Sequence, residues 1–246
     1  IARVQPSQVI HLAGISAVTH PDPLDFYRVN LMGTQNLLQA LNQLPQKPAR
    51  ILLASSANVY GHIAAGELSE NQPPKPVNHY AISKLGMEYM AATFSTQLPI
   101  VLVRPFNYTG VGHDDRFVIP KIVDHFQRKA PIIELGNLNV EREYNDVRTV
   151  CKAYLDLLNK GQVGEVYNIC SGRTVTIKQV VSTLENISGH RIEVKVNPDF
   201  LRANEIQKIS GNPHKLEACT GLLQWPTLQD TLTWMLAHPT AALEPL

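Results

Sequence analysis

Short apolar segments alternate along this chain with longer amphipathic segments, and this alternation restricts the fold more than any other feature. Residues 9–14, 50–56 and 99–104 are apolar segments of strand length. Residues 25–44 and 79–97 carry apolar side chains at helical spacing. Such an order is typical of parallel strands joined by right-handed helical crossovers. We therefore predict an α/β fold built on a parallel sheet.

The pattern changes after Pro105. We predict helices at residues 117–128, 146–158, 176–188 and 226–238, extended segments at residues 131–135 and 165–169, and an irregular segment at residues 197–213. The loop at residues 107–115 separates a sheet domain, residues 1–110, from a smaller and mostly helical lobe, residues 111–246. We expect some segments of the second lobe to return to the sheet domain.

The composition argues against several classes of partner. The chain has 246 residues, of which 44% are hydrophobic and 17% are charged, and its net charge is +1. This balance gives no overall field for a nucleic acid or an anionic bilayer, so we expect neither as a partner. No apolar run approaches the roughly 18 residues of a membrane span, and the first residues lack the pattern of a signal peptide. We therefore expect a cytoplasmic protein.

The spacing of cysteine and histidine gives no sign of a metal site. Cys151, Cys170 and Cys219 are widely separated and odd in number, which fits neither a disulfide framework nor a CxxC metal site. We expect all three to be buried or neutral thiols. The nine histidines do not form an HExxH motif. We therefore expect no bound metal.

Polar or glycine-containing loops follow three of the predicted strands. Gly14 follows the first strand, Ser55 and Ser56 follow the second, and Asn107 follows the third. The carboxyl ends of parallel strands share one edge of the sheet, where open α/β sheets bind their ligands. We expect functional residues in these loops, although serines at a strand end also commonly satisfy main-chain groups.

Tyr80 and Lys84 lie four residues apart in a predicted helix, so their side chains leave the same face. An ammonium near a phenol lowers the pKa of the phenol, which makes tyrosine a usable acid or base near neutral pH. The hydroxyl of Ser56 could then share a substrate oxygen with the tyrosine. Taken alone, the same spacing also fits a solvated lysine beside a half-buried ring.

Four motifs occur in a fixed order: HLAG at residues 11–14, SSANVYG at 55–61, YAISK at 80–84 and RPFN at 104–107. With these motifs the chain resembles the extended short-chain dehydrogenase/reductase family, in its branch of nucleotide-sugar epimerases, dehydratases and reductases. The resemblance implies a Rossmann-like, doubly wound parallel sheet, incomplete at its N-terminus, and NAD or NADP as cofactor. The glycine turn of the family does not precede residue 9, so we expect the chain alone to bind a dinucleotide weakly.

The resemblance implies an enzyme with Ser56, Tyr80 and Lys84 as its catalytic residues. Tyr80 would exchange a proton with a sugar hydroxyl or ketone, and Ser56 would hydrogen-bond that oxygen. Lys84 would lower the pKa of the tyrosine and hold the nicotinamide ribose. Asn30 would be the structural asparagine of the following helix. The residues expected to bind the cofactor are Leu12, Ala13, Gly14, Ser55, Tyr80, Lys84, Arg104 and Pro105.

Four segments resemble the group of GDP-mannose 4,6-dehydratases and GDP-4-keto-6-deoxymannose reductases. They are residues 104–110, 136–148, 200–206 and 211–216. The resemblance implies a nucleotide-diphosphate sugar, GDP-linked, as substrate. The residues expected to bind it are Asn58, Asn107, Val118, Lys121, Arg142, Arg202 and Glu205.

The chemistry of three of these residues agrees with a GDP-linked substrate. The guanidinium groups of Arg142 and Arg202 suit a diphosphate, and the carboxylate of Glu205 suits the N–H edge of guanine. The arginines could instead form surface ion pairs with Glu141 or Glu143.

Two departures from the family bear on the reaction. Asn58 stands where the dehydratases carry a carboxylate, and an amide cannot act as that general acid. Ala57 stands where the GDP-fucose-type epimerase-reductases carry a cysteine. A 4-ketoreductase remains, favoured by the substrate segments, with a 4-epimerase as the alternative.

The residues argue against two further classes of protein. A non-catalytic dinucleotide-binding protein is a third alternative, against which the presence of Tyr80 and Lys84 argues. The chain has no GxSxG motif, which argues against a serine hydrolase. The habit of the family implies a homodimer formed through the helix that carries Tyr80 and the long helix before it.

Overall fold

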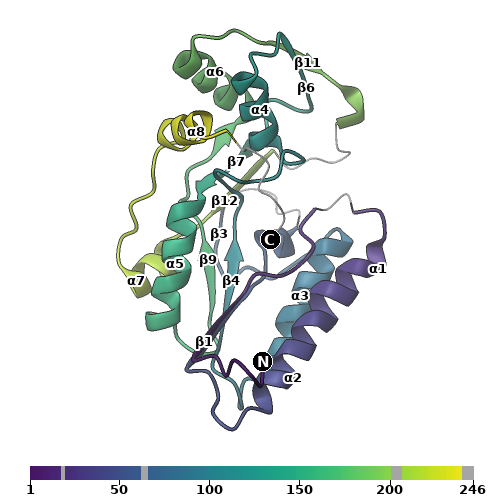
Figure 1. Ribbon diagram of the computed structural model, residues 1–246, viewed down its shortest axis with the longest axis vertical. Coiled ribbons are helices and arrows are strands. Elements are labelled where there is room, and N and C mark those ends of the chain that lie inside the picture. Colours follow the sequence, from purple (N-terminus) through teal and green to yellow (C-terminus); the bar gives the residue numbers. More distant parts are fainter. Residues whose placement is uncertain (18–19, 62–65, 201–206, 240–246) are drawn as a thin grey trace. The chain divides into compact units, whose positions relative to one another are not determined.

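The computed structural model describes residues 1–17, 20–61, 66–200 and 207–239 (Figure 1). The chain divides into two compact units that interleave along the sequence. The first unit consists of Ile1–Phe106, Cys151–Cys170 and Gly211–Leu223, and the second of Asn107–Val150, Ser171–Ser210 and Gln224–Leu246. Each unit has its own apolar core.

The first unit is built on a sheet of four parallel strands. The strands are β1 (Gln8–His11), β2 (Arg50–Ala54), β4 (Ile100–Pro105) and β9 (Val166–Ile169), in the order β1-β2-β4-β9. The register places Leu52 between Ile10 and Val101. Residues 51–53 of β2 are fully buried, as expected of a central parallel strand covered on both faces. The predicted α/β fold with a parallel sheet is confirmed.

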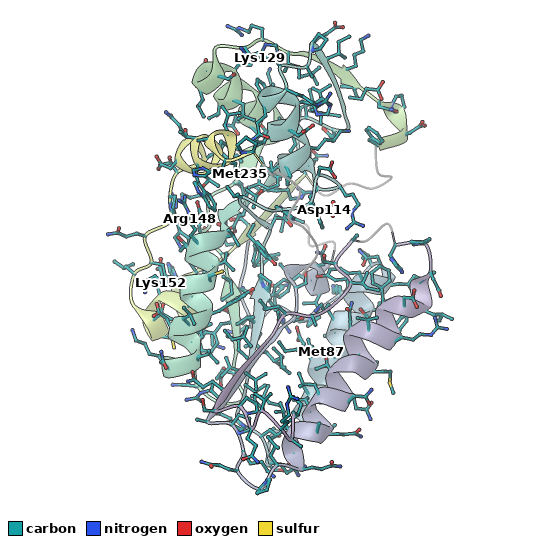
Figure 2. The ribbon with its side chains drawn as sticks, viewed as in Figure 1. Met87, Asp114, Lys129, Arg148, Lys152 and Met235 are labelled. Atoms are coloured by element: carbon teal, nitrogen blue, oxygen red, sulfur yellow. The ribbon has the colours of Figure 1, made fainter. Side chains whose placement is uncertain are left out.

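Helices cover both faces of this sheet (Figure 1). The helices of one face are α2 (Thr34–Asn42) and α3 (His79–Ala92), and on the other face lies the part of α5 (Val147–Lys160) that belongs to this unit. The core beneath α2 and α3 includes Leu38, Leu53 and Met87, the last of which is labelled in Figure 2. The apolar face of each helix is thereby removed from water, which is the main stabilising contribution.

The predicted helix at residues 25–44 is wrong in its middle. The chain forms α1 (Pro23–Phe26), a π-helical segment (Tyr27–Gly33) and then α2. The π-helical turns are wider than α-helical turns, and such turns are frequent at functional sites. Asn30 lies in this segment and is buried, and the bonds of its side chain are described with the site.

Caps fix the starts of these helices. Asp22 accepts from the N–H of Leu24 at 2.9 Å, and Asn78 accepts from the N–H of Ala81 at 2.8 Å, where α3 begins. Three smaller elements complete the first unit: a 3₁₀ helix (Ala57–Tyr60), β3 (Glu67–Leu68) and α7 (His214–Thr220). The helix α7 was not predicted from the sequence.

The second unit packs three helices around its core. They are α4 (Val118–Gln127), α6 (Ile177–Ser188) and α8 (Leu228–Ala237). Its short strands are β5 (Tyr108–Thr109), β6 (Ile132–Leu135), β7 (Glu141–Arg142), β8 (Asn145–Asp146), β10 (Val175–Thr176), β11 (Glu193–Val196) and β12 (Lys208–Gly211), and a 3₁₀ helix follows β11 at Pro198–Phe200. Strand β6 pairs with β11, β5 with β8, and β7 with both β10 and β12.

The prediction of a mostly helical second lobe understates its strands. Strand β11 was not predicted, and β12 lies within the segment 197–213 that the sequence suggested was irregular. Strand β11 alternates polar and apolar residues, as EVKV, but is only four residues long. Strand β12, KISG, has the same length and includes a serine and a glycine, so neither sequence gives a strong strand signal. Within the parts of the chain that the structure describes, every helix is too short or too polar to span a bilayer.

Candidate active site

Ser56 begins the 3₁₀ helix that follows strand β2. Its side chain is 5% exposed, and its Oγ accepts from the N–H of Asn58 at 3.2 Å and from Nδ2 of Asn58 at 3.1 Å. Since both of these partners are donors, the hydroxyl proton of Ser56 remains available to donate. Asn58, predicted to touch the substrate, therefore orients the serine hydroxyl.

Lys84 reaches the same end of β2 from helix α3. Its Nζ donates to the carbonyl oxygen of Ala54 at 2.8 Å, two residues before Ser56. The lysine is buried, and this burial lowers its pKa to about 8, against the opposing effect of the negative charge of Glu88. A group with this pKa is mostly an ammonium at neutral pH and loses its proton under mildly alkaline conditions.

Tyr80 lies one helical turn before Lys84 on the buried face of α3. Its side chain is 8% exposed and its ring packs against that of Phe26, with the ring centroids 6.0 Å apart. The hydroxyl of Ser83 donates to the main-chain oxygen of Tyr80 at 2.8 Å. Tyr80 and Lys84 are thus held on one face of one helix, as the sequence predicts.

Asn30 ties the loop after β1 to helix α3. Its Oδ1 accepts from the N–H of Ile15 at 2.8 Å, and its Nδ2 donates to the oxygen of Ile15 and to Oγ of Ser83, both at 3.1 Å. A Cβ placed on Gly14 would lie 2.7 Å from Oδ1 of Asn30 and 3.4 Å from Nζ of Lys84. Only glycine leaves room for this approach. The ends of β1 and β2 therefore meet Lys84 at one place.

His11 is a member of this cluster that the sequence analysis did not single out. Its Nε2 lies 2.9 Å from Oγ1 of Thr34, which itself donates to the main-chain oxygen of Asn30 at 2.7 Å. The hydroxyl proton of Thr34 is used in the bond to Asn30. In the bond between His11 and Thr34, Nε2 of His11 is therefore the donor and Oγ1 of Thr34 the acceptor. Burial and the charge of Lys84 lower the pKa of His11, so the ring is neutral at neutral pH. Its position in the HLAG motif is the signal that could have pointed to it.

The residues at this edge fit the nicotinamide–ribose half of a dinucleotide. Oγ of Ser55 is buried and has no hydrogen-bond partner among the described residues. Lys84 has three donors, and the carbonyl of Ala54 takes one of them. Leu12, Ala13 and Gly14 beside them are exposed. Hydroxyl groups of a ribose would satisfy these unfilled polar positions.

Arg104 uses its side chain elsewhere. Its guanidinium forms a two-pronged bond with the carboxylate of Glu88, with N···O distances of 2.9 and 2.6 Å, and donates to the hydroxyl of Tyr60 at 3.1 Å. For Arg104, the predicted contact with the cofactor therefore concerns the main chain, and Pro105 remains a prediction as a cofactor-binding residue.

Of the predicted substrate-binding residues that the structure describes, four lie in the second unit. Asn107 is exposed, and its main-chain oxygen accepts from the N–H of Asn145 at 2.9 Å. Val118 is the first residue of α4 and is half-buried. Nζ of Lys121, one turn later on the same helix, donates to the oxygen of Glu134 at 2.8 Å. Asn107, Val118 and Lys121 remain predictions as binding residues.

Arg142 lies on β7, and its Nη1 donates to its neighbour's main-chain oxygen, that of Glu141, at 2.8 Å. It donates to the oxygen of Gln207 at 3.4 Å as well. Arg202 and Glu205, the other predicted contacts of the nucleotide, lie outside the described residues. All three remain predictions as substrate-binding residues.

Part of the motif at residues 136–148 is structural. Asp146 accepts a two-pronged bond from Arg148, with distances of 2.9 and 2.6 Å, and also accepts from Oγ1 of Thr231 at 2.8 Å. The guanidinium of Arg148, labelled in Figure 2, lies 3.9 Å from the ring centroid of Trp234. These contacts join the start of α5 to α8, so Asp146 and Arg148 stabilise the second unit.

Glu143 is a buried carboxylate in the same motif. It is 1% exposed and accepts from Nδ2 of Asn145 at 3.0 Å and from the N–H of Ser171 at 2.8 Å. These bonds tie the turn after β7 to the loop that follows β9. The alternative that Glu143 forms an ion pair at the surface with an arginine is wrong, because its carboxylate is buried.

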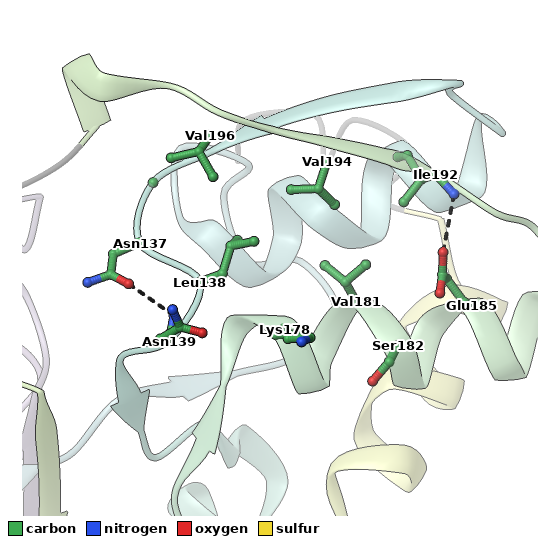
Figure 3. Close-up of a pocket in the computed structure, with 11 residues that line it drawn as sticks. Asn137, Leu138, Asn139, Lys178, Val181, Ser182, Glu185, Ile192, Val194 and Val196 are labelled. Atoms are coloured by element: carbon green, nitrogen blue, oxygen red, sulfur yellow. Dashed lines mark hydrogen bonds between the residues drawn. The ribbon is translucent and has the colours of Figure 1, made fainter.

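A pocket of about 690 Å³ lies in the second unit, and its lining includes none of the predicted site residues that the structure describes (Figure 3). Its lining is apolar at Leu138, Val181 and Val194, with Lys178 and Glu185 among its polar members. In the described ranges, no group of three or more His, Cys, Asp or Glu side chains could hold a metal ion.

The three cysteines differ in their exposure. Cys170 is buried and Cys219 is half-buried, but Cys151 is exposed.

Comparison with known proteins places this arrangement in a family. The model of the GDP-mannose 4,6 dehydratase family matches residues 1–233. A GDP-6-deoxy-D-talose 4-dehydrogenase of Aggregatibacter actinomycetemcomitans is 37% identical over 216 residues, which cover 88% of this chain and 74% of that protein. A GDP-6-deoxy-D-mannose reductase of Pseudomonas aeruginosa is 35% identical over 243 residues, covering 94% of this chain and 80% of the reductase.

Solved structures agree. RMD from Pseudomonas aeruginosa, solved with NADPH, superposes with a TM-score of 0.90 at 34% identity over 95% of this chain and 81% of that one. A candidate epimerase from Burkholderia cenocepacia J2315 gives a TM-score of 0.91 at 46% identity over 96% of this chain and 76% of that one. The chain belongs to the GDP-mannose 4,6 dehydratase family, within the NAD-dependent epimerases and dehydratases of the extended short-chain dehydrogenase/reductase class, which are NAD(P)-dependent enzymes of nucleotide sugars.

Proposed function

We propose that this protein reduces the C4 ketone of a GDP-linked 4-keto-6-deoxy sugar, with Ser56, Tyr80 and Lys84 as its catalytic residues. The observation that carries the proposal is the bond from Lys84 to the carbonyl oxygen of Ala54. It places a buried ammonium at the end of β2, beside Ser56 and one helical turn from Tyr80. The named activities of the two relatives at 37% and 35% identity support the same carbon and the same nucleotide.

In this mechanism the chain supplies a hydrogen bond and a proton. NADH or NADPH, when bound, supplies the hydride to C4. Ser56 donates its hydroxyl proton in a hydrogen bond to the C4 oxygen, because its lone pairs already accept from Asn58. Tyr80 transfers its phenolic proton to the same oxygen as the C=O double bond becomes a C–H and an O–H bond. The ammonium of Lys84 stabilises the phenolate that remains.

Dehydration is a poor alternative at this site. The position two residues after Ser56 is Asn58, and its amide is bound to the serine oxygen. An amide has no proton to exchange near neutral pH, so it cannot serve as the acid or base that removal of water requires. The proposed reaction therefore needs no group beyond the serine, tyrosine and lysine.

The configuration of the product separates the two curated relatives. 6-Deoxytalose and 6-deoxymannose are epimers at C4, so the two named activities concern opposite configurations at that carbon. Which face of the ketone meets the hydride depends on how the second unit orients the nucleotide. We propose residues 1–110 as the NAD(P)-binding part and residues 111–246 as the part that binds the nucleotide sugar, through Asn107, Val118, Lys121, Arg142, Arg202 and Glu205.

A 4-epimerase is the second candidate, favoured by the 46% identity to the Burkholderia structure. An epimerase would oxidise and re-reduce the same carbon with no net use of cofactor. A reductase consumes one NAD(P)H for each ketone. Measuring cofactor absorbance together with the sugar product therefore separates the two candidates.

The test uses the full-length protein. With NADPH or NADH and GDP-4-keto-6-deoxymannose, we expect loss of absorbance at the reduced-cofactor band and a GDP-6-deoxyhexose product. Tyr80→Phe keeps the ring that packs on Phe26 and removes the proton donor. We expect at least about a 10²-fold loss of kcat in this variant. A Tyr80→Phe rate equal to that of the unchanged enzyme would refute the role of the tyrosine.

We also propose a homodimer formed through the outer faces of α3 and the π-helical segment. Ile82 and Tyr89 lie seven residues apart on α3 and are exposed, as are Val29 and Met32 of the π-helical segment. Neighbouring exposed apolar side chains on two packed helices are typical of an interface. Sedimentation equilibrium should give a dimer mass for the unchanged protein and a monomer mass for Tyr89→Glu. A monomer mass for the unchanged protein would refute the proposal.

A further inference from the structure

A network of buried polar side chains crosses the first unit behind the catalytic residues. Arg104 of β4 binds Glu88 of α3 and the hydroxyl of Tyr60, at the distances given above. The hydroxyl of Tyr60 donates in turn to Oδ1 of Asn168 on β9 at 2.7 Å. Asn168 is fully buried, and its Nδ2 donates to the oxygen of Leu68 at 2.8 Å. The network thus joins five elements: β4, α3, the 3₁₀ helix, β9 and β3.

Two members of the network stand one turn beyond a catalytic residue. Glu88 follows Lys84 by four residues on α3, so their side chains leave the same face of the helix. Tyr60 follows Ser56 by four residues and ends the 3₁₀ helix that Ser56 begins. Arg104 contacts both Glu88 and Tyr60. It therefore joins the helix that carries Lys84 to the turn that carries Ser56.

The pair of Arg104 and Glu88 is charged although it is buried. The two side chains are 7% and 6% exposed. Burial opposes the charge of Arg104, but the bonds to Glu88 and its negative charge raise the pKa of the guanidinium overall. Burial raises the pKa of Tyr60, next to which Glu70 adds a further negative charge, so its phenol stays neutral. Arg104 and Glu88 thus form a buried, two-pronged ion pair.

Among the described residues, Glu88 on its own helix and His11 on β1 interact with the charge of Lys84, and β2 supplies the carbonyl of Ala54. Arg104 of β4 lies behind Glu88, to which it is bonded. His11 is neutral at neutral pH, since burial and Lys84 itself lower its pKa. Burial favours the uncharged amine of Lys84, and Glu88 is the group that opposes this effect.

We infer that Glu88 and Arg104 are positioning residues of the active site: Glu88 keeps Lys84 charged inside the protein, and Arg104 holds Glu88 and Tyr60 so that Lys84 and Ser56 keep their places. The electrostatic part concerns the chain itself. The catalytic part rests on the proposed function, because it concerns the tyrosine that Lys84 assists. The side chain of Arg104 thus positions catalytic residues without touching the cofactor or the substrate.

Nuclear magnetic resonance of full-length protein labelled with ¹³C at the lysine Cε tests the electrostatic part, because the Cε shift follows the charge of the amine. Lys84 is assigned by its absence from the spectrum of Lys84→Arg. In Glu88→Gln we expect the titration midpoint of Lys84 to move to lower pH than in the unchanged protein. The exposed Lys152, which pairs with Asp156 at 2.8 Å, should keep its midpoint in the same samples.

A second variant guards against misfolding. Glu88→Met with Arg104→Met replaces the ion pair by apolar chains of similar length, a change that buried pairs often tolerate. A downward shift of the Lys84 midpoint is expected there too, but a smaller one than in Glu88→Gln, because the positive charge of Arg104 is removed together with the negative charge of Glu88. An unchanged Lys84 midpoint in either folded variant, judged by circular dichroism, overturns the inference.

The activity assay separates this inference from the proposed function. In Glu88→Gln the alkaline limb of kcat/KM should move to lower pH together with the Lys84 midpoint. If the Lys84 midpoint shifts in Glu88→Gln but the unchanged protein does not reduce the keto sugar, the inference is supported and the proposed function is refuted. A shifted midpoint with an unmoved alkaline limb in an active enzyme overturns the catalytic part.

Discussion

Replacing Asn30 by alanine tests how firmly the loop after β1 is held against the catalytic helix. The substitution removes the three hydrogen bonds that join Asn30 to the main chain of Ile15 and to Ser83, at 2.8, 3.1 and 3.1 Å. Asn30 is 1% exposed, so water does not replace its side chain without rearrangement. Gly14, which packs against Oδ1 of Asn30, loses its support as well.

The expected loss of stability follows from these bonds. A typical hydrogen bond contributes about 1 kcal/mol net, and Ile15 is only half-buried, so its main chain can regain water. We therefore expect Asn30→Ala to lower the free energy of unfolding by about 2–3 kcal/mol. For a chain of this size that corresponds to a fall in Tm of about 4–12 °C. The displaced loop should also raise the KM for the cofactor.

The matched control is Asn36→Ala, at an exposed position of α2. This change should leave Tm within about 2 °C of the unchanged protein, because surface substitutions usually change stability by less than about 0.5 kcal/mol. Thermal unfolding is followed by circular dichroism, and the cofactor KM by the absorbance assay. Equal Tm values for Asn30→Ala and Asn36→Ala would show that the bonds of Asn30 do not hold the loop.

Three further predictions concern the turn after the 3₁₀ helix, the serine and the lysine. Gly61 has φ +65° and its Cβ would lie 1.7 Å from the oxygen of Lys75, whereas Gly164 has φ +85° with open space around it; Gly61→Ala should therefore lower Tm far more than Gly164→Ala, and equal losses would contradict this. In Asn58→Asp the new carboxylate should accept the hydrogen bond of the Ser56 hydroxyl, which is then no longer donated to the substrate. We expect kcat to fall by about 10²-fold, and an unchanged kcat would contradict the proposed donor role of the serine. The pKa of Lys84 is about 8 when folded and 10.5 ordinarily, so the unfolded chain binds more protons between these values and stability rises with pH across that window. Lys84→Met should therefore be more stable than the unchanged protein by about 3 kcal/mol at pH 7. In urea titrations this advantage should shrink as pH rises through 8, and a constant difference would contradict the assignment.

The parallel sheet and the placement of Lys84 could be predicted from the sequence because both depend on local patterns. The runs at residues 50–56 and 99–104 are nearly continuous apolar segments, and buried parallel strands have few alternatives. The spacing of Tyr80 and Lys84 fixes a common face on any helix. Since the strands are parallel, their polar ends share one edge, and this brings Lys84 to Ala54.

Other features depend on contacts between distant residues and left no local pattern. The π-helical turns contain Asn30, whose side chain bonds to Ile15 and Ser83, 15 and 53 residues away in the sequence. The sequence alone could not show whether the Arg104 side chain binds Glu88 or the cofactor, because an arginine at a strand end suits both roles. Strands as short as β7 and β12 form by pairing rather than by their own sequence preference.

Transfer of deuterium from labelled cofactor to the sugar tests the central claim most directly. The full-length protein is incubated with GDP-4-keto-6-deoxymannose and NADPH, or NADH, that carries deuterium at nicotinamide C4, on either face in turn. Nuclear magnetic resonance then locates the label in the product. The account predicts deuterium at sugar C4 with one of the two labelled faces, and no labelled product from Tyr80→Phe. Product that carries no deuterium at C4 with either face, or labelled product formed by Tyr80→Phe at the unchanged rate, would contradict it.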